Sequence, residues 1–330
     1  MDKAKVSVLI TFYNSEKYVD KAMESVLSQV ADFSIRIIVG DDGSSDRTCQ
    51  IINEWIKKYP DLIELHVMER GEGPYISGFR SSQNRLNLLK YVDTDYFIFL
   101  DGDDYYEYDN KLRKQVGILD DPSNSDCIAC GHNAYILYSD GKKTTTIPEN
   151  VTECKFDPKT YWAKYYCHTD SLLFRSSVIK SIDFDLMAND FNDNLITFCA
   201  IQSGKIYYIP QCWVTYLQTG EGVWTSKKEQ INWIRNAILI DLCNKINPSL
   251  KRQTNLRMSY SWKRLYQLRK TFKSEELTLL EEDVLNHDLK DSYKWIHYNE
   301  LGPFAKLTLL IKVIYIGISK KIFKLFNKVS

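Results

Sequence analysis

Three carboxylates follow an apolar segment within four positions. The stretch "FIFLDGDDYY" (residues 97–106) runs from Phe97–Leu100 directly into Asp101, Asp103 and Asp104. Like charges this close repel one another unless a positive group lies between them. Carboxylate oxygens are preferred ligands of hard divalent cations such as Mg²⁺ and Mn²⁺. The spacing therefore favours a metal or a basic partner here, with a solvated turn as the alternative.

Two other apolar segments also end in polar clusters. "VSVLI" (Val6–Ile10) precedes "TFYN", and "IRIIV" (Ile35–Val39) precedes "GDDGSSD". These segments alternate with helical patterns, which predicts an α/β fold with a mostly parallel, doubly wound sheet. Ligands of such sheets bind beyond the carboxyl ends of the strands, so we expect the polar clusters to converge there. No glycine-rich phosphate loop follows the first strand, so a phosphate-bearing ligand would need a metal.

The rest of the sequence continues the alternation of strands and helices and then becomes helical toward the C-terminus. Apolar spacing of 3–4 residues predicts helices after the first and second strands, and Ser45 or Asp46 can cap the second helix. From about Ser226 onward the pattern is helical. The other expected elements are a third strand at 62–68, a helix at 79–92, a helix at 192–204 and a strand at 205–210.

Composition sets limits on partners and compartment. The 330 residues carry no net charge, and 44% are hydrophobic, which is typical of a globular protein without a field that attracts nucleic acid. The first residues, "MDKAKVSVLITFYN", lack a secretory signal pattern, so we expect a cytoplasmic protein with reduced thiols. Cys127 and Cys130 precede His132, but one such pair favours buried thiols over a zinc site.

Five segments of the sequence form a recognisable ordered set: "VSVLITFYNSEKYVDKAMESVLSQ", "IRIIVGDDGSSDRT", "FIFLDGDDYYEYDNKLRKQVGIL", "CHTDSLLFRSSVI" and "GKIYYIPQCWVTYLQTGEGVWTS". Together they resemble the family 2 glycosyltransferases of bacterial capsule, lipopolysaccharide and other surface-polysaccharide synthesis, which have the GT-A fold. The resemblance covers roughly residues 5–240, and its first three segments are specific as an ordered set.

The resemblance implies a Rossmann-like, mostly parallel sheet with flanking helices, followed by a C-terminal helical region. We expect a catalytic domain over 1–225, a helical region over 226–300 and a basic amphipathic helix over 301–330. The implied reaction is metal-dependent and inverting. It moves a sugar from a nucleotide sugar, expected to be a UDP-sugar, to a hydroxyl of a glycan or lipid-linked acceptor.

The family pattern also implies roles for individual residues. Asp41 or Asp42 would meet the base, and Asp101 would lie near the ribose. Asp101-Gly102-Asp103 matches the family's Asp-any-Asp motif. Asp103, with Asp101 as a second candidate ligand, would hold the Mn²⁺ or Mg²⁺ that bridges the diphosphate. The residues implied for nucleotide-sugar binding are Thr11, Tyr13, Glu16, Asp41, Asp42, Ser44, Asp46, Asn84, Asp101 and Gly102.

The family's catalytic base is an aspartate at the start of the helix before "GKIYYIP". Counting back from that segment places it at Asp193, with Asp190 as the rival. Each has an alternative role as a helix cap or first-turn carboxylate. We expect catalysis from Asp193 and capping from Asp190.

The sequence departs from the family pattern in two places. Members often carry an arginine and a histidine shortly after the "YIP" strand, where this chain has Leu217 and Thr219. The metal shell would then have fewer ligands, or water would complete it. The Gln-any-any-Arg-Trp signature of processive synthases is absent, which favours adding one sugar per acceptor. Two alternatives remain at this point: an inactive nucleotide-binding module, and a haloacid dehalogenase-like phosphotransferase that uses an Asp nucleophile.

The C-terminal segment "KLTLLIKVIYIGISKKIFKLFNKVS" contains no acidic residue, and Lys312 interrupts its apolar run, which is too short to span a membrane. This layout is typical of a helix lying on an anionic membrane surface, here the cytoplasmic face. The alternative is a terminal helix that packs on the protein. On a helical wheel Lys306, Lys320, Lys321, Lys324 and Lys328 share one side, opposite Ile311, Ile318, Ile322 and Phe326.

Overall fold

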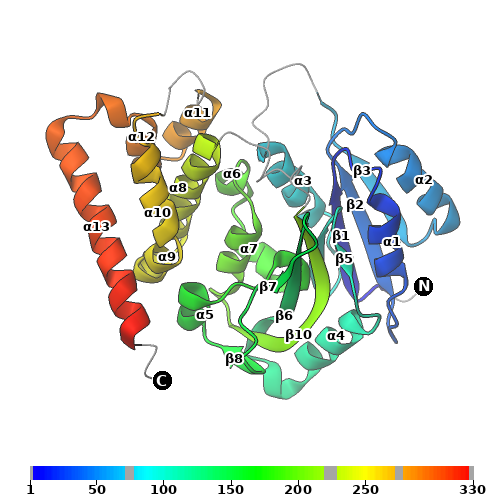
Figure 1. The fold of residues 1–330 in the computed structure, drawn as a ribbon. Coiled ribbons are helices and arrows are strands. Elements are labelled where there is room, and N and C mark those ends of the chain that lie inside the picture. Colours follow the sequence, from blue (N-terminus) through cyan, green and yellow to red (C-terminus); the bar gives the residue numbers. More distant parts are fainter. Residues whose placement is uncertain (1–2, 71–77, 219–228, 272–277, 327–330) are drawn as a thin grey trace. The chain divides into compact units, whose positions relative to one another are not determined.

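The computed structural model describes residues 3–70, 78–218, 229–271 and 278–326. The chain forms two compact units (Figure 1). The first comprises Met1–Tyr161 and Tyr165–Gly222, and the second comprises Trp162–Lys164 and Val223–Ser330. The domain boundary expected at residue 225 lies outside the described residues.

A mixed sheet forms the centre of the first unit, in the order β3-β2-β1-β4-β9-β6-β10-β5. Four strands from the N-terminal half pair in parallel: β1 (Val6–Phe12), β2 (Ile35–Asp41), β3 (Ile63–Val67) and β4 (Tyr96–Asp101). The expected α/β fold with a parallel core is therefore confirmed. The remaining strands are β5 (Tyr105–Tyr106), β6 (Cys127–Tyr138), β7 (Lys143–Thr145), β8 (Cys154–Phe156), β9 (Leu173–Arg175) and β10 (Lys205–Gln218).

Helices cover both faces of the parallel strands, which explains why apolar residues point to both sides of β1 and β4. Val8 and Ile10 belong to a buried core that includes residues of α1, α2 and α4. Phe99, whose side chain points to the opposite face, contacts the ring of Phe191 just before α7. The helices of this part of the chain are α1 (Val19–Leu27), α2 (Thr48–Lys58), α3 (Phe79–Leu89), α4 (Lys111–Asp120), α5 (Pro158–Lys164), α6 (Phe184–Met187) and α7 (Asp193–Ala200).

Two elements differ from the expected bounds. The strand expected over 205–210 continues to Gln218, because β6 and β5 pair with it beyond Pro210. β8 pairs with it only before Pro210, at Ile206–Tyr208. Proline cannot donate to the ladder, and the pairing with β6 shifts register between Ile209 and Cys212. The helix expected over 192–204 is shorter, running from Asp193 to Ala200 as α7. Cys127 and Cys130 lie buried in β6.

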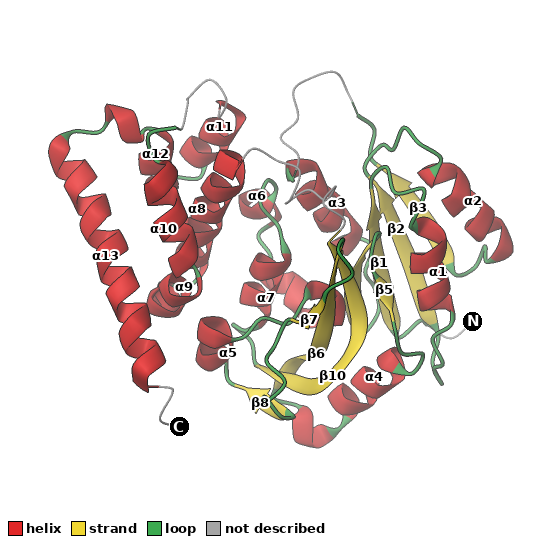
Figure 2. Cartoon of the chain, in the orientation of Figure 1, coloured by secondary structure: helices red, strands yellow, loops and turns green. Residues whose placement is uncertain are grey.

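The described residues of the second unit are mainly helical, as expected for the C-terminal region (Figure 2). Trp262 and Trp295 are fully buried there, with ring centroids 6.0 Å apart. Lys312 reaches the same core from the last helix. The main helices are α8 (Glu229–Ile246), α9 (Lys251–Arg257), α10 (Ser259–Leu268), α11 (Thr278–Asn286), α12 (Lys290–Ile296) and α13 (Pro303–Phe326).

Candidate active site

The strand register brings the three polar clusters together. In the β1–β2 ladder Phe12 lies opposite Asp41, and in the β1–β4 ladder Thr11 lies opposite Asp101. The carboxyl ends of β2, β1 and β4 therefore meet at one edge of the sheet, where ligands of parallel sheets bind.

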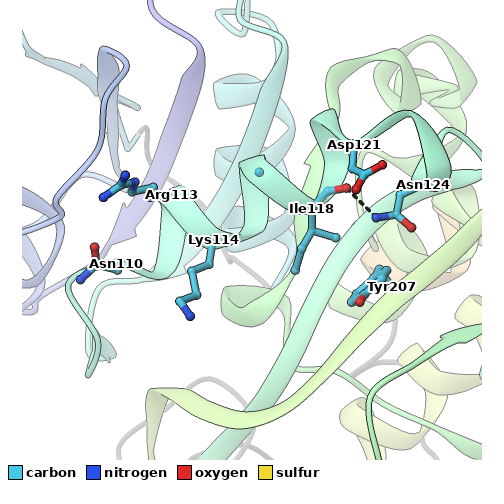
Figure 3. A pocket seen from close by; sticks show the side chains of 8 residues that line it. Asn110, Arg113, Lys114, Ile118, Asp121, Asn124 and Tyr207 are labelled. Carbon is cyan, nitrogen blue, oxygen red and sulfur yellow. Dashed lines mark hydrogen bonds between the residues drawn. The ribbon is translucent and has the colours of Figure 1, made fainter.

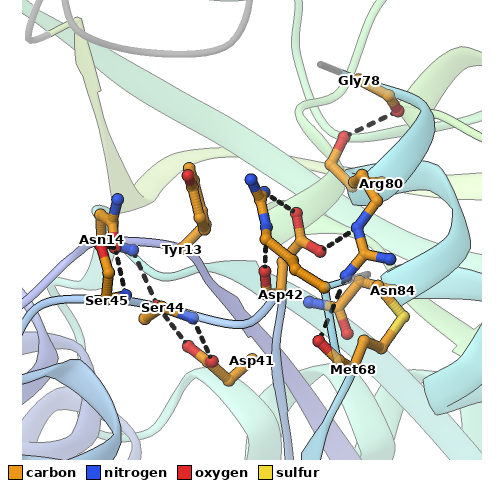
Figure 4. Close-up of polar contacts among 12 residues, drawn as sticks. Tyr13, Asn14, Asp41, Asp42, Ser44, Ser45, Met68, Gly78, Arg80 and Asn84 are labelled. Carbon is orange, nitrogen blue, oxygen red and sulfur yellow. Dashed lines mark hydrogen bonds and ion pairs between the residues drawn. The ribbon is translucent and has the colours of Figure 1, made fainter. Parts of the chain in front are cut away.

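Asp42, just beyond β2, is held by two arginines (Figure 4). Arg70 Nη2 donates to one carboxylate oxygen at 2.7 Å, and Arg80 Nε donates to the other at 2.6 Å. The Arg70 guanidinium also lies 3.9 Å from the ring centroid of Tyr13, whose side chain is 44% exposed. Asp42 thus orients Arg70 against Tyr13, and this exposed ring can stack on a flat ligand.

Asp41, the last residue of β2, has partners within its own loop. Its two carboxylate oxygens accept from the backbone N–H and the hydroxyl of Ser44, at 2.8 and 2.5 Å. The Ser44 hydroxyl in turn accepts from the backbone N–H of Asn14 at 2.9 Å. Asp41 and Ser44 therefore fix the loop after β2 against the loop after β1.

Glu16 and Asp46 connect the same two loops. The carboxylate of Glu16 accepts from Arg47 N, and that of Asp46 accepts from Glu16 N, both at 3.1 Å. Asp46 also accepts from Thr48 N at 3.0 Å, but the N-cap of α2 is Arg47, which makes no side-chain cap hydrogen bond, so the expected cap by Ser45 or Asp46 is wrong. Burial opposes the charged form of Asp46, but these hydrogen bonds outweigh it and lower its pKa. Both carboxylates position the loops.

Asn84 anchors α3 to the sheet. Its side-chain nitrogen donates to the carbonyl of Gly40 in β2 at 3.0 Å. A Cβ atom on Gly40 would lie 2.2 Å from the Asn84 side-chain oxygen, so this close approach requires glycine. The same helix carries Arg85, whose Nη2 donates to Asp101 Oδ1 at 2.5 Å. Asp101 also accepts from the hydroxyl of Thr11 at 3.4 Å.

The turn after β4 places Asp103 beside Asp101. Gly102 is required there, because a Cβ atom would lie 2.1 Å from the ring of Phe12. Burial, and then the charge of Asp101, raises the pKa of Asp103 to about 6. The raised pKa shows that nearby positive charge does not fully compensate this carboxylate. Such a carboxylate fits a divalent cation, which would offset both negative charges.

Asp193 begins α7, and Asn192 caps the helix by accepting from Asn194 N at 3.0 Å and Leu195 N at 3.2 Å. The expectation that Asp190 caps this helix is therefore wrong. Asp190 lies three positions earlier and is only 1% exposed. Asp193 is partly exposed and accepts a hydrogen bond from the hydroxyl of Tyr166.

Asp193 also shares its surroundings with the turn after β4. Its charge acts on Arg85, together with the charges of Asp101 and Asp170. The sequence analysis did not identify Arg70, Arg80 and Arg85, and no signal in the sequence links them to the strand ends.

Of the two positions that depart from the family pattern, Leu217 contacts the acidic turn through its backbone, with its N–H donating to Asp104 Oδ1 at 2.8 Å. Thr219 lies outside the described residues. A separate pocket of about 510 Å³ lies between α4 and the start of β10 (Figure 3). Its lining contains none of the predicted site residues and consists of Asn110, Arg113, Lys114, Gly117, Ile118, Asp121, Asn124 and Tyr207.

Comparison with known proteins gives a family and a fold. The model of the family described as "Glycosyl transferase family 2" matches residues 7–182. An uncharacterized protein of Mycobacterium tuberculosis is 27% identical over 222 residues, or 67% of this chain and 61% of the relative. The chain thus matches about three fifths of that relative's length. An uncharacterized glycosyltransferase of Rickettsia typhi is 36% identical over 206 residues, 62% of this chain and 60% of the relative.

Among solved structures, Staphylococcus aureus TarS 1–349 in complex with UDP-GlcNAc superposes with a TM-score of 0.58 at 17% identity. The match covers 97% of this chain and 91% of the TarS chain. At this identity the likeness concerns the fold.

Proposed function

Because the chain belongs to glycosyl transferase family 2, we propose that it transfers single sugars from a nucleotide sugar to an acceptor hydroxyl. The chain is a glycosyltransferase with a GT-A-like fold, and this excludes the phosphotransferase alternative. One observation supports the proposal above the others. Arg85 donates to Asp101, and the charges of Asp101 and Asp193 both raise the pKa of Arg85 against the effect of burial, which supports placing the donor-side carboxylate and the candidate base in one site.

We place the nucleotide at the carboxyl ends of β1 and β2. Tyr13 offers an exposed ring for stacking the base, and the guanidinium of Arg70 supports that ring from the other side. Asp101 follows on β4, at the expected place of the ribose. A UDP-sugar is the proposed donor, and the presence of UDP-GlcNAc in the TarS structure supports this choice.

Asp103, with Asp101 beside it, would hold Mn²⁺ or Mg²⁺, and the bound ion would offset the charge of the leaving diphosphate. Arg85 keeps Asp101 in place and supplies a fixed positive charge. Asp193 accepts the proton of the attacking acceptor hydroxyl, and Tyr166 orients its carboxylate. A single displacement of this kind inverts the anomeric configuration. The proposed acceptor is a glycan or lipid-linked sugar of a bacterial surface polysaccharide.

A donor-hydrolysis screen tests this proposal. We expect the purified chain to release nucleoside diphosphate slowly from one UDP-sugar in Mn²⁺ and not in EDTA, because such a site leaks donor to water. Release can be followed with a coupled diphosphate assay across UDP-, GDP- and dTDP-sugars. Tight, Mn²⁺-dependent binding of UDP without hydrolysis or transfer would instead support the inactive-module alternative.

We also propose that α13 rests on an anionic membrane surface. Among the described residues, no helix has the length and apolar character needed to cross a bilayer. One side of α13 packs within the second unit: Leu309 and Ile316 are buried, and Lys312 donates to Asp291 and lies 4.2 Å over the ring of Trp262. The other side exposes large apolar side chains, namely Phe304, Leu307, Ile311, Ile314, Tyr315, Ile318 and Ile322.

The structure bears out the packed alternative for this segment, and the exposed side of the helix supports the membrane proposal. The helix packs on the protein, and an apolar stripe remains on its exposed side. Lys321 is exposed near one end of the stripe, and Lys306 donates to the carbonyl of Asn299. The side chains of Lys324, Phe326 and Lys328 lie outside the described residues. Apolar burial with flanking lysines is what supports the membrane proposal.

Substituting the stripe should weaken membrane binding and leave the fold intact. We expect the double variant Ile311→Asn/Ile318→Asn to bind anionic vesicles at least about tenfold more weakly in a sedimentation assay. Full burial of an isoleucine side chain contributes about 1.5–3 kcal/mol, and each substitution would remove part of that contribution to membrane binding. Both side chains are exposed, so the melting temperature should stay the same. Lys321→Gln should lower binding at low salt only. Unchanged vesicle binding of the double variant would contradict the proposal. If the wild-type chain has a larger mass in solution than the double variant, the stripe instead binds a second copy of the chain.

A further inference from the structure

Asp104, His168 and Asp170 form a buried cluster next to the proposed donor site. Asp104 lies in the turn between β4 and β5, and the other two lie around the short 3₁₀ turn Thr169–Ser171. Their candidate ligand atoms all lie within 4.8 Å of one another. The three residues are only 1%, 7% and 0% exposed.

The polar atoms of this cluster are short of partners. Asp104 Oδ1 accepts from Leu217 N, but Asp104 Oδ2, both oxygens of Asp170 and His168 Nδ1 make no hydrogen bond with any residue that the structure describes. His168 Nδ1 lies 3.5 Å from Asp170 Oδ2, beyond a good hydrogen bond. Buried polar atoms normally have a partner, so their convergence indicates a missing one.

Neighbouring groups fix the cluster and do not fill it. The His168 ring stacks on Tyr216 with centroids 4.6 Å apart, and its carbonyl accepts from the Ser171 hydroxyl at 2.6 Å. Two outside cations act on Asp170, but each donates elsewhere. Arg85 donates to Asp101, and Lys111 donates to the side-chain oxygen of Gln115 at 2.9 Å.

We propose that Asp104, His168 and Asp170 bind a divalent cation of their own, separate from the ion that Asp103 would hold with the donor. Two carboxylates and one imidazole suit Mn²⁺, which accepts oxygen and nitrogen ligands together. The ion would connect the turn after β4 to the 3₁₀ turn at Thr169–Ser171. His168 would supply an imidazole to the acidic turn from another segment.

The competing arrangement has no metal. Two buried carboxylates can share one proton, and burial together with the charge of Asp170 raises the pKa of Asp104 well above its usual value. The two arrangements differ in one measurable respect, because only the first binds Mn²⁺ without any nucleotide.

A nucleotide-free Mn²⁺ titration of the full chain tests the proposal. Loss of the electron paramagnetic resonance signal of free Mn²⁺ measures binding, and we expect one site per chain. Asp104→Asn, His168→Gln and Asp170→Asn should each weaken that site at least about tenfold. Asp104→Asn keeps an oxygen that can accept from Leu217 N. Mn²⁺ should also raise the melting temperature of the wild-type chain and not that of the variants.

Two variants separate this site from others. Asp103→Asn should keep nucleotide-free binding and lose only the Mn²⁺-dependent binding of UDP, so the two proposals fail independently. His297→Gln is a matched control, because His297 lies 2.9 Å from both Glu281 and Glu300 and is also largely buried. It should bind Mn²⁺ like the wild type.

The proposal is overturned if the wild-type chain binds no Mn²⁺ without nucleotide, or if Asp103→Asn removes that binding as well. Circular dichroism identifies variants that fail to fold. If none of the three ligand variants folds, melting of the wild-type chain and of Asp103→Asn provides the test. The proposal requires that Mn²⁺ raise the melting temperature of both, and it is overturned if Mn²⁺ changes neither.

Discussion

Replacing Asp193 with asparagine is expected to slow sugar transfer by about 100-fold or more, because positioned proton transfer contributes that much. Donor binding should stay the same, since the proposed donor contacts come from the ends of β1, β2 and β4. The measurements are the transfer rate with a saturating donor and the affinity for UDP by calorimetry.

The surroundings of Asp193 make this substitution informative. An asparagine side chain keeps the shape of aspartate and an oxygen that can accept from the Tyr166 hydroxyl. What it loses is the ability to take a proton. Tyr166→Phe should leave the base in place and remove only its orientation, so we expect a smaller loss in rate than for Asp193→Asn.

Asp190→Asn is the control for the position of the base. Asp190 is almost fully buried and is not the cap of α7, so its loss should affect stability more than transfer. If Asp190→Asn abolishes transfer in a folded protein while Asp193→Asn stays active, the base lies one helical turn earlier than we propose. The family match ends at residue 182 and favours neither position.

The parallel strands and their polar ends were predictable because they depend on local pattern. Val8–Ile10 and Phe97–Leu100 are apolar runs, which are typical of strands buried on both faces. Once β1, β2 and β4 are parallel neighbours, their carboxyl ends must meet. The positions of Asp41 and Asp101 beside β1 follow from that geometry.

The partners of these carboxylates were not predictable, because they come from distant positions. Arg70 and Arg80 reach Asp42 from 28 and 38 residues away, and Arg85 reaches Asp101 from 16. No spacing rule links a strand end to a particular arginine on a later loop or helix. The cluster of His168 and Asp170 with Asp104 was not predictable for the same reason, because these residues are distant in the sequence.

The C-terminal helix α13 shows a different limit of prediction from sequence, which concerns the orientation of the helix. A helical wheel separates an apolar side from a basic side, but it does not say which side faces the protein. Here Lys312 faces inward, because its ammonium group donates a hydrogen bond to Asp291 and lies over the ring of Trp262. An inward lysine leaves isoleucines such as Ile311 and Ile318 outside.

Asp103→Asn is expected to abolish the Mn²⁺-dependent part of UDP binding. A neutral amide is a weaker ligand than a carboxylate, and it no longer helps to balance the charge of the diphosphate and the ion. Titration of UDP by calorimetry, with Mn²⁺ and with EDTA, measures this part as the difference between the two affinities. Equal affinity of wild type and variant in Mn²⁺ would contradict the role of Asp103.

The same substitution should make the metal-free protein more stable at neutral pH. Burial raises the pKa of Asp103 to about 6, so the folded chain holds this proton more tightly than the unfolded chain does. Stability therefore falls as pH rises from about 4 to about 6, and the penalty is complete above that range. It amounts to at most about 3 kcal/mol. Asparagine carries no charge, so the variant should melt higher than wild type at pH 7.5 and no higher at pH 4.

Asp241→Asn is a control that separates the two expected effects of Asp103→Asn, namely the loss of Mn²⁺-dependent UDP binding and the changed pH dependence of melting. Burial also raises the pKa of Asp241 to about 6, but this residue belongs to the second unit and accepts from Ser292. Its substitution should change the pH dependence of melting and leave UDP binding in Mn²⁺ unchanged. A residue kept for stability would lower the melting temperature when replaced. Replacing a carboxylate that serves to bind a cation should instead raise the melting temperature in EDTA. Without the cation, the folded wild-type chain carries a buried negative charge that nothing offsets, and the asparagine variant does not.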